Sequence, residues 1–559
     1  MGLGLSTFAL KTLKEGRILN GNETPEDMVS RISSALFDTP DVQEFKMLLL
    51  EKKVVMSTPI MTNAGSKNNR PLSACIVLRS NDRNIPSREL IKSLHTEGMG
   101  TGFNLDEVDD PIATLRYLND IALENARGGN EDRPVGNMAI MSITNPRIRD
   151  FISIKNDTIT SGQEWKFNLS VDVTKSFMGY IIHPKDYSAS ADAQAAFGLF
   201  NEIVQNAHSC GDPGLVFMHR FDEDNPAPHS GKHAGTSPCA EVSLVPDETC
   251  QFGYINVGKF LMAGQDINVI DYEGIAAATR LLTKALDNIL DINVSKYSYK
   301  KSIEVVKARR KIGIGICGLA DLLGAMRLPY DTEGARELAR DLVSFINYTS
   351  KLESINLSKE RGPFGAFDRS RYMDHPGFIE MKYGNVTTNT VSADMWNVLG
   401  EKIRQHGIRN VTTIALPPTG RSALTIDAST GIEPFFTLTD DHGNINPYLL
   451  KELSDLNLLD DELLHQIRKS GKISDIGIIP VDLRNAFKTA TEISPEAHLE
   501  MQAALQQVVD DAISKTINLP EEATTEDVAS IYKKAYSLGV KGITVFRIGS
   551  TRQPKKVAR

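Results

Sequence analysis

The sequence of 559 residues is poor in cysteine and tryptophan and has no long apolar run. Five cysteines are too few, and odd in number, for a disulfide framework, and they predict a reducing compartment, the cytoplasm. None lies in a Cys-x-x-Cys motif or a cysteine–histidine cluster with zinc spacing, so we expect no metal site. No apolar stretch approaches the roughly 18 residues of a membrane span, and no signal-peptide pattern is present, so neither is expected.

An excess of positive charge is also lacking. The net charge is −9 and the sequence pI is about 5.8, which argues against a general nucleic-acid-binding surface. Hydrophobic residues make up 41% of the chain and charged residues 24%, which are ordinary values for a globular protein with a substantial core. We therefore expect neither a nucleic acid nor a membrane as partner.

Short apolar runs alternate with helical stretches along most of the chain. Apolar residues recur at helical spacing over 5–55, and a helix over 196–209 lies between strand candidates at 168–171 and 214–217. This alternation predicts an α/β fold with mostly parallel strands. The glycine-rich segment 98–104 is predicted to be a turn.

No long linker rich in proline, serine or glycine interrupts the chain, so we do not divide it into independent domains. We expect an N-terminal helical segment packed on the main body, then one large α/β region with helical insertions, and a short mobile basic tail. The expected bounds are 1–55, 56–549 (with 445–536 mainly helical) and 550–559.

Three of the five cysteines have neighbours that suit radical chemistry. Cys239 lies two residues before Glu241, Cys250 follows, and Cys75 lies far upstream. A thiol that carries a radical can take a hydrogen atom from a substrate while a nearby carboxylate accepts a proton. Two further thiols that meet can supply two electrons by closing to a disulfide. Taken alone, Cys239 and Glu241 fit a buried structural cysteine beside a surface acid better.

A second candidate site is a turn of small polar residues after an apolar run, Pro418-Thr419-Gly420-Arg421-Ser422. Such a turn at a helix N-terminus presents free backbone N–H groups to an anion, and Arg421 adds a positive charge. A simple strand-to-helix turn is the alternative interpretation.

Taken in order, the motifs resemble the catalytic subunit of ribonucleotide reductases, and most closely the adenosylcobalamin-dependent class. The family's Asn-Pro-Cys-Gly-Glu corresponds to Ser237–Glu241, and its Leu-Ser-Ala-Cys is unchanged at Leu72–Cys75. The other matching segments are Thr58-Pro59, Asn63-Ala64-Gly65, Gly102-Phe103-Asn104, Gly211-Asp212-Pro213-Gly214 and Ile255-Asn256-Val257. The resemblance covers nearly the whole chain.

The resemblance implies a ten-stranded α/β barrel of the ribonucleotide reductase and glycyl radical enzyme type, with the radical cysteine on a central loop. It implies reduction of ribonucleotides to 2′-deoxyribonucleotides, which are DNA precursors. Cys239 would carry the thiyl radical, Glu241 would accept a proton, and Cys75 and Cys250 would form the redox pair. Ser237 stands where the family has asparagine. The implied substrate-binding residues are Thr58, Ser73, Ala74, Gly100, Pro418, Thr419, Gly420, Arg421 and Ser422.

The radical source follows from the strand candidate near the C-terminus. Family members fed by a partner subunit carry a tyrosine pair there, whereas this chain has Phe546, which has no O–H group to oxidise. The resemblance therefore implies adenosylcobalamin as cofactor. It also implies a ribonucleoside di- or triphosphate substrate and, because the C-terminal Cys-x-x-Cys of many relatives is absent, a thioredoxin-like protein or dithiol as reductant. Control by a nucleotide effector stays open, because the segment 102–137 is shorter than is usual in the family. The choice between monomer and homodimer also stays open.

Four other interpretations remain. Ser237 favours a related radical enzyme that acts on a different or modified nucleotide. A catalytic subunit that needs a radical-generating partner is disfavoured by Phe546, and a non-enzymatic nucleotide-binding homologue by the intact cysteines and Glu241. The segment 313–318 fits the dinucleotide pattern G-x-G-x-x-G, but no clear strand precedes it and no suitably placed acid follows. We interpret it as a strand–helix contact.

Overall fold

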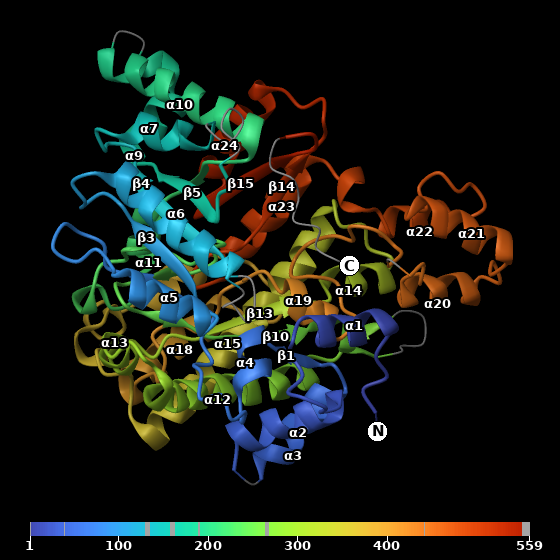
Figure 1. Cartoon of the computed structure of the whole chain (residues 1–559). Helices are drawn as coiled ribbons and strands as arrows, with labels where there is room; N and C mark the ends of the chain where they lie inside the picture. Colours follow the sequence, from blue (N-terminus) through green and yellow to red (C-terminus); the bar gives the residue numbers. More distant parts are fainter. Residues whose placement is uncertain are drawn as a thin grey trace.

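The computed structural model of the chain describes residues 2–38, 40–128, 135–156, 163–187, 190–262, 268–440 and 442–550 (Figure 1). Within these ranges no helix combines the length and apolar character needed to cross a membrane. The predicted basic tail lies outside the described residues apart from Ser550.

Three helices begin the chain: α1 (Thr7–Glu15), α2 (Pro25–Leu36) and α3 (Asp41–Leu50). The α2 helix starts with a capping box, in which Thr24 and Asp27 each bond the other's backbone N–H. Their apolar faces join the main core, and α2 and α3 pack on the long helix α12 (Tyr272–Lys296). The N-terminal segment is therefore docked on the body of the molecule (Figure 1).

The largest sheet has eight strands in the order β14-β15-β6-β5-β4-β3-β2-β9. Its centre is a parallel run joined by helical crossovers such as α6 (Pro111–Arg127) and α10 (Ala191–Cys210), as the alternating pattern predicted. Strand β2 pairs antiparallel with β9, and β6 pairs antiparallel with β15. The bounds are β2 (Cys75–Leu78), β3 (Gly100–Asn104), β4 (Asn137–Ser142), β5 (Phe167–Asp172), β6 (Gly214–Val216), β9 (Thr249–Cys250), β14 (Thr516–Leu519) and β15 (Gly542–Arg547).

A second set of strands faces this run. Strand β10 (Phe252–Asn256) lies between β1 (Val54–Met56) and β13 (Gly313–Cys317). Parallel bridges continue from Ile314 to Ile414 and from Leu416 to Ile513, toward β14. Only Gln251 separates β9 from β10, so one stretch of chain joins the two sets. The molecule has the α/β barrel fold that the resemblance implied.

Only Gly98, at the start of the glycine-rich segment 98–104, lies in a turn, and the part from Gly100 on is a strand and not the turn that we predicted. It forms β3 in the middle of the large sheet, and its glycines serve a close approach of two chains. A Cβ atom on Gly102 would lie 2.3 Å from the carbonyl oxygen of Thr236. The glycine content of this segment led us to predict a turn, whereas the glycines are explained by a close contact with a distant part of the chain.

The segment 313–318 does not have the layout of a dinucleotide-binding turn. Two of its three glycines, Gly313 and Gly315, lie inside strand β13, whose five residues are all buried, and Gly318 is the residue before helix α14 (Leu319–Ala325). A Cβ atom on Gly313 would lie 2.6 Å from the ring of Phe252, so glycine allows β13 to pack on β10. We interpreted the glycines as a strand–helix contact; the close contact that they allow joins two strands, β13 and β10.

Residues 445–536 contain helices α20 (Pro447–Asp455), α21 (Asp461–Ser470), α22 (Val481–Ala486), α23 (Pro495–Gln506) and α24 (Thr525–Ser537), together with strand β14. Helices α20 to α22 have their own apolar cluster and stand at the edge of the molecule (Figure 1). The division of the chain into segments stays a proposal based on these elements.

Candidate active site

A loop inside the barrel carries Cys239 and Glu241. Residues 237–242, here called the finger loop, connect the short strands β7 (Gly235–Thr236) and β8 (Ser243–Leu244). Pro238 packs where β3 and β4 begin, because Cβ atoms on Gly100 and Gly136 would each lie 3.0 Å from its ring. The side chain of Asn168, on β5, donates a hydrogen bond of 2.7 Å to the Pro238 carbonyl oxygen.

Cys75 and Cys250 are direct partners in the antiparallel pair of β2 and β9. Both are buried, and neither is in a disulfide. The Sγ atom of Cys250 lies 3.8 Å from the carbonyl oxygen of Cys75, to which it donates. Burial, and then the contact with Cys75, raises the pKa of the Cys250 thiol well above its ordinary value. The Cys250 thiol stays protonated at neutral pH, so it suits hydrogen donation better than nucleophilic attack.

Cys75, of the predicted redox pair, and the finger loop meet at one glycine. A Cβ atom on Gly100 would lie 3.0 Å from the ring of Pro238 and 3.2 Å from the Sγ atom of Cys75. Cys239 follows Pro238 directly, and its side chain is exposed, in contrast to the two buried thiols. The structure therefore brings the three cysteines predicted for the site into one region of the barrel.

Glu241 is buried, with 3% of its surface exposed. Burial raises the pKa of its carboxyl to about 7; the neighbouring Ser237 hydroxyl opposes this rise, and the charge of Asp511 adds to it. Within the described residues, Oε2 of Glu241 and the Ser237 hydroxyl make no hydrogen bond of normal geometry. These atoms are therefore available to a polar ligand, and a carboxyl with this pKa can exchange a proton near neutral pH.

The predicted phosphate-binding turn lies next to this region. Leu416, just before Pro417 and Pro418, donates its N–H to the Ala512 carbonyl oxygen at 3.1 Å, while the Ala512 N–H donates to the Glu241 carbonyl oxygen at 3.0 Å. Thr419 precedes helix α19 (Gly420–Leu424), and its hydroxyl accepts the N–H of Gly431 at 2.7 Å. One residue, Ala512, thus links the turn to the finger loop.

Thr58 begins the short helix α4 (Thr58–Asn63), which follows β1 directly. The N–H of Ser57 donates to the carbonyl oxygen of Phe252, two residues after Cys250, and α19 packs against β1. Ala74 donates its N–H to the Cys250 carbonyl oxygen at 3.0 Å, and Gly100 donates its N–H to the Ala74 carbonyl oxygen at 2.9 Å. The predicted substrate-binding positions therefore lie around the redox pair and the finger loop.

A buried network behind the redox pair was missed by sequence reasoning. The Tyr297 hydroxyl lies 2.7 Å from the Ser73 hydroxyl and 2.6 Å from that of Thr249, and Gln251 donates to Ser73 at 2.8 Å. Burial raises the pKa of Tyr297 to about 12, so its hydroxyl stays protonated. The Ser73 side chain is engaged in this network, which leaves its backbone for any ligand. A single tyrosine near the end of a long helix carries no pattern that would have revealed it.

Ala240 stands at a position that favours glycine, with a φ of 61°. A residue other than glycine in the left-handed region destabilises the folded state by about 1–2 kcal/mol. Glycine avoids this cost, but its greater conformational entropy stabilises the unfolded chain by about 0.4–1 kcal/mol. We expect Ala240→Gly to raise the thermal unfolding midpoint by about 1 °C. Ala234→Gly, in the same stretch but outside the left-handed region, should lower it. Equal shifts in both variants would contradict this explanation.

Two family models match the chain. The ribonucleotide reductase barrel domain matches residues 102–546, and the ribonucleotide reductase all-alpha domain matches residues 3–69. The vitamin B12-dependent ribonucleoside-diphosphate reductase of Mycobacterium tuberculosis (strain CDC 1551 / Oshkosh) is 31% identical over 98% of this chain and 80% of its own length. The protein with that name from Thermoplasma acidophilum is 30% identical over 90% of this chain and 65% of its own length.

Among solved structures, the Actinobacillus ureae class Id ribonucleotide reductase alpha subunit superimposes with a TM-score of 0.78 at 18% sequence identity, covering 98% of both chains. This likeness supports the fold, and the family models and relatives support the descent. The chain belongs to the ribonucleotide reductase family.

Proposed function

We propose that this protein reduces ribonucleotides to 2′-deoxyribonucleotides through a thiyl radical on Cys239 and so supplies DNA precursors. The observation that carries the proposal is the register pair Cys75–Cys250 beside a loop that holds an exposed thiol and a buried acid. A reaction that needs one radical sulfur, one proton acceptor and one two-electron donor finds all three in this region.

In the proposed reaction the Cys239 thiyl takes the 3′-hydrogen of the ribose. Glu241 accepts the 3′-hydroxyl proton while the 2′-hydroxyl leaves as water, protonated from the Cys75–Cys250 pair. The pair closes to a disulfide and supplies the two electrons, and its second hydrogen goes to the 2′-carbon. Glu241 gives its proton back to the 3′-oxygen, and the 3′-hydrogen returns from Cys239, which regains its radical. Overall, one ribonucleotide and two thiols give one deoxyribonucleotide, one water and one disulfide.

Adenosylcobalamin is the proposed radical source. Cys239 is exposed and Ala240 is half-buried, so these two residues of the finger loop fit contact with such a cofactor. When bound, this cofactor supplies a carbon-centred radical that can remove the thiol hydrogen atom. Phe546, which lies on β15 opposite Asn518, has no hydroxyl for radical transfer, and relatives at about 30% identity are named vitamin B12-dependent.

The proposed substrate is a ribonucleoside diphosphate or triphosphate, and the names of the relatives favour the diphosphate. Thr58, Ser73, Ala74 and Gly100 would hold the nucleoside, and Pro418 to Ser422 the phosphates, with Arg421 adding charge. An external thioredoxin-like protein or dithiol would reduce the Cys75–Cys250 disulfide in the cytoplasm. The proposal fits a monomer or a homodimer, with or without a nucleotide effector.

The test is anaerobic incubation of the purified protein with dithiol, adenosylcobalamin and each of the four ribonucleotides, followed by mass spectrometry of the products. We expect a 2′-deoxyribonucleotide whose formation depends on the cofactor. A modified sugar other than 2′-deoxyribose would instead support the alternative that Ser237 suggests. Turnover only after addition of a radical-generating partner would overturn the cobalamin assignment.

A further inference from the structure

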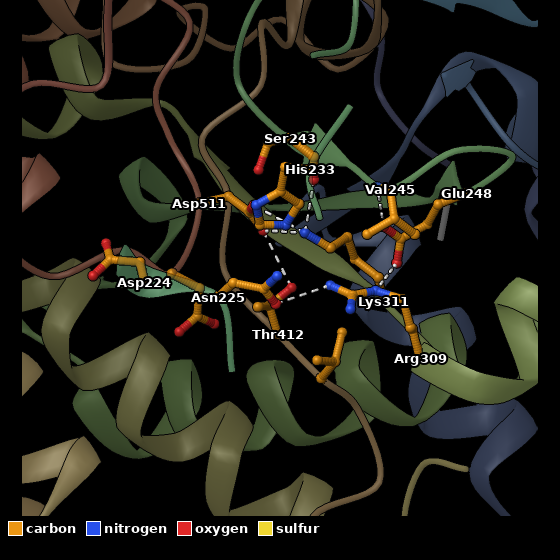
Figure 2. Close-up of polar contacts among 12 residues, drawn as sticks. Asp224, Asn225, His233, Ser243, Val245, Glu248, Arg309, Lys311, Thr412 and Asp511 are labelled. Atoms are coloured by element: carbon orange, nitrogen blue, oxygen red, sulfur yellow. Dashed lines mark hydrogen bonds and ion pairs between the residues drawn. The ribbon is translucent and has the colours of Figure 1, made fainter. Parts of the chain in front are cut away.

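Buried charged side chains lie beside Ser243, on the strand that follows the finger loop (Figure 2). In its centre Lys311 and Asp511 face each other, with the Lys311 nitrogen 2.9 and 3.1 Å from the two Asp511 carboxylate oxygens. Both residues are only 3% exposed. The Thr412 hydroxyl donates a third bond to Asp511 at 3.1 Å. The proposed reaction uses none of these groups directly.

Two backbone contacts join this ion pair to the finger loop, which carries Glu241, and to strand β8, which follows the loop. Lys311 donates a hydrogen bond of 2.9 Å to the Ser243 carbonyl oxygen, two residues after Glu241. On the other side, Ala512, the residue after Asp511, donates its N–H to the Glu241 carbonyl oxygen at 3.0 Å. The backbone is thus hydrogen-bonded at two carbonyl groups, those of Glu241 and Ser243. The ion pair connects the two donors, because Asp511 directly precedes Ala512 and pairs with Lys311.

A neighbouring pair holds the next turn of the same chain. Arg309 donates to the Glu248 carboxylate at 2.9 Å, and the other oxygen of that carboxylate accepts the Val245 N–H at 3.0 Å. Glu248 is two residues before Cys250. Arg309 and Lys311, two residues apart on one basic segment, therefore both bond the stretch of chain that runs from Glu241 to Cys250.

We propose that Lys311 and Asp511 are a positioning pair for Glu241: they fix the backbone that presents its carboxyl, and their two opposed charges act on that carboxyl. The inference rests on the proton-acceptor role proposed for Glu241 above. Stability alone does not account for such a pair, because well-packed apolar side chains in place of a buried ion pair are often neutral or stabilising.

The charges around Glu241 determine the sign of the effect. Asp511 opposes ionisation of Glu241 and raises its pKa, in addition to the larger effect of burial. By Coulomb's law the Lys311 cation acts in the opposite sense. The other groups that interact with Glu241 or Asp511 are Ser237, Cys239, Cys250, His233, Lys351, Tyr372 and Lys541.

A raised pKa means that a carboxylate acting as base is lost as the pH falls through about 7. Removing the anion with Asp511→Asn should move this loss to lower pH, by about one unit at the effective dielectric of a protein site. Removing the cation with Lys311→Met should leave the pH at which the Glu241 carboxylate is lost equal to or above that of wild type. Simple loosening of the loop would hydrate Glu241 and lower its pKa in both variants.

The titration can be measured without cofactor or turnover. Infrared difference spectra over a pH series, with Glu241→Gln to assign the carboxyl band, report the proton on Glu241 directly. Asp510→Asn is the matched control, because Asp510 is also buried and is paired at 2.8 Å with Lys351, but it accepts the N–H groups of Thr413 and Ile414 instead. We expect this control to leave the Glu241 titration in place.

A titration in Asp511→Asn that coincides with wild type overturns the inference, and so does a lowered titration in Lys311→Met. If Asp511→Asn does not fold, Lys311→Met decides alone by the same criterion. The two proposals fail separately: a wild-type protein that makes no deoxyribonucleotide contradicts the function, whatever the spectra show. Product formation with an unmoved Asp511→Asn titration contradicts only the positioning pair.

Discussion

Replacing Cys239 with serine is expected to abolish deoxyribonucleotide formation completely. A serine O–H bond is much stronger than a thiol S–H bond, so the radical cannot be placed on residue 239 and the 3′-hydrogen is never removed. The change is nearly isosteric at an exposed position of the finger loop, so the fold should be retained. Product analysis by mass spectrometry measures the loss, and electron paramagnetic resonance should show no sulfur radical in the variant.

Nucleotide binding is the control for Cys239→Ser. The predicted phosphate turn and the helix start at Thr58 do not involve this side chain, so calorimetry should give a dissociation constant within about twofold of wild type, a change of less than 0.5 kcal/mol. Substantial product from this variant would end the radical assignment. Loss of both binding and activity would point to a structural role for Cys239.

Replacing Cys250 with serine should lower turnover by about three orders of magnitude or more, as for other groups that act as one unit. Without this thiol the register pair cannot close to a disulfide, so the substrate has no two-electron donor. The exposed Cys239 is untouched, and the variant should still form its radical. Steady-state assays with excess dithiol, together with the radical signal, check this separation.

Cys210→Ser is the matched control for the redox variant. Cys210 is also buried, but it donates to the Asp212 carbonyl oxygen at 3.3 Å, and serine can replace this donor. We expect activity within a few-fold of wild type. Equal losses in Cys210→Ser and Cys250→Ser would show that burial of a hydroxyl, and not redox chemistry, explains the effect.

The site could be predicted from the sequence to the extent that its chemistry lies in short motifs. Cys239 and Glu241 are two residues apart, so any compact loop keeps them together, and the alternation of apolar runs with helices indicated the parallel strands. Glycines misled the local reasoning at 98–104, because the reason for them is a carbonyl oxygen of Thr236, far along the chain. Lys311 was not among the predicted site residues, since its partner lies 200 residues away.

The sequence by itself determined which atoms are available: three thiols, one acid and a polar turn, in an order similar to that of a known enzyme family. Only the tertiary structure decided that Cys75 and Cys250 are register partners and that Ala512 ties the polar turn to Glu241. It also decided that Glu241 lies deep enough to hold its proton near neutral pH. The physical reason is that side-chain types are local properties, whereas burial, register and the sum of charges depend on segments that only folding brings together.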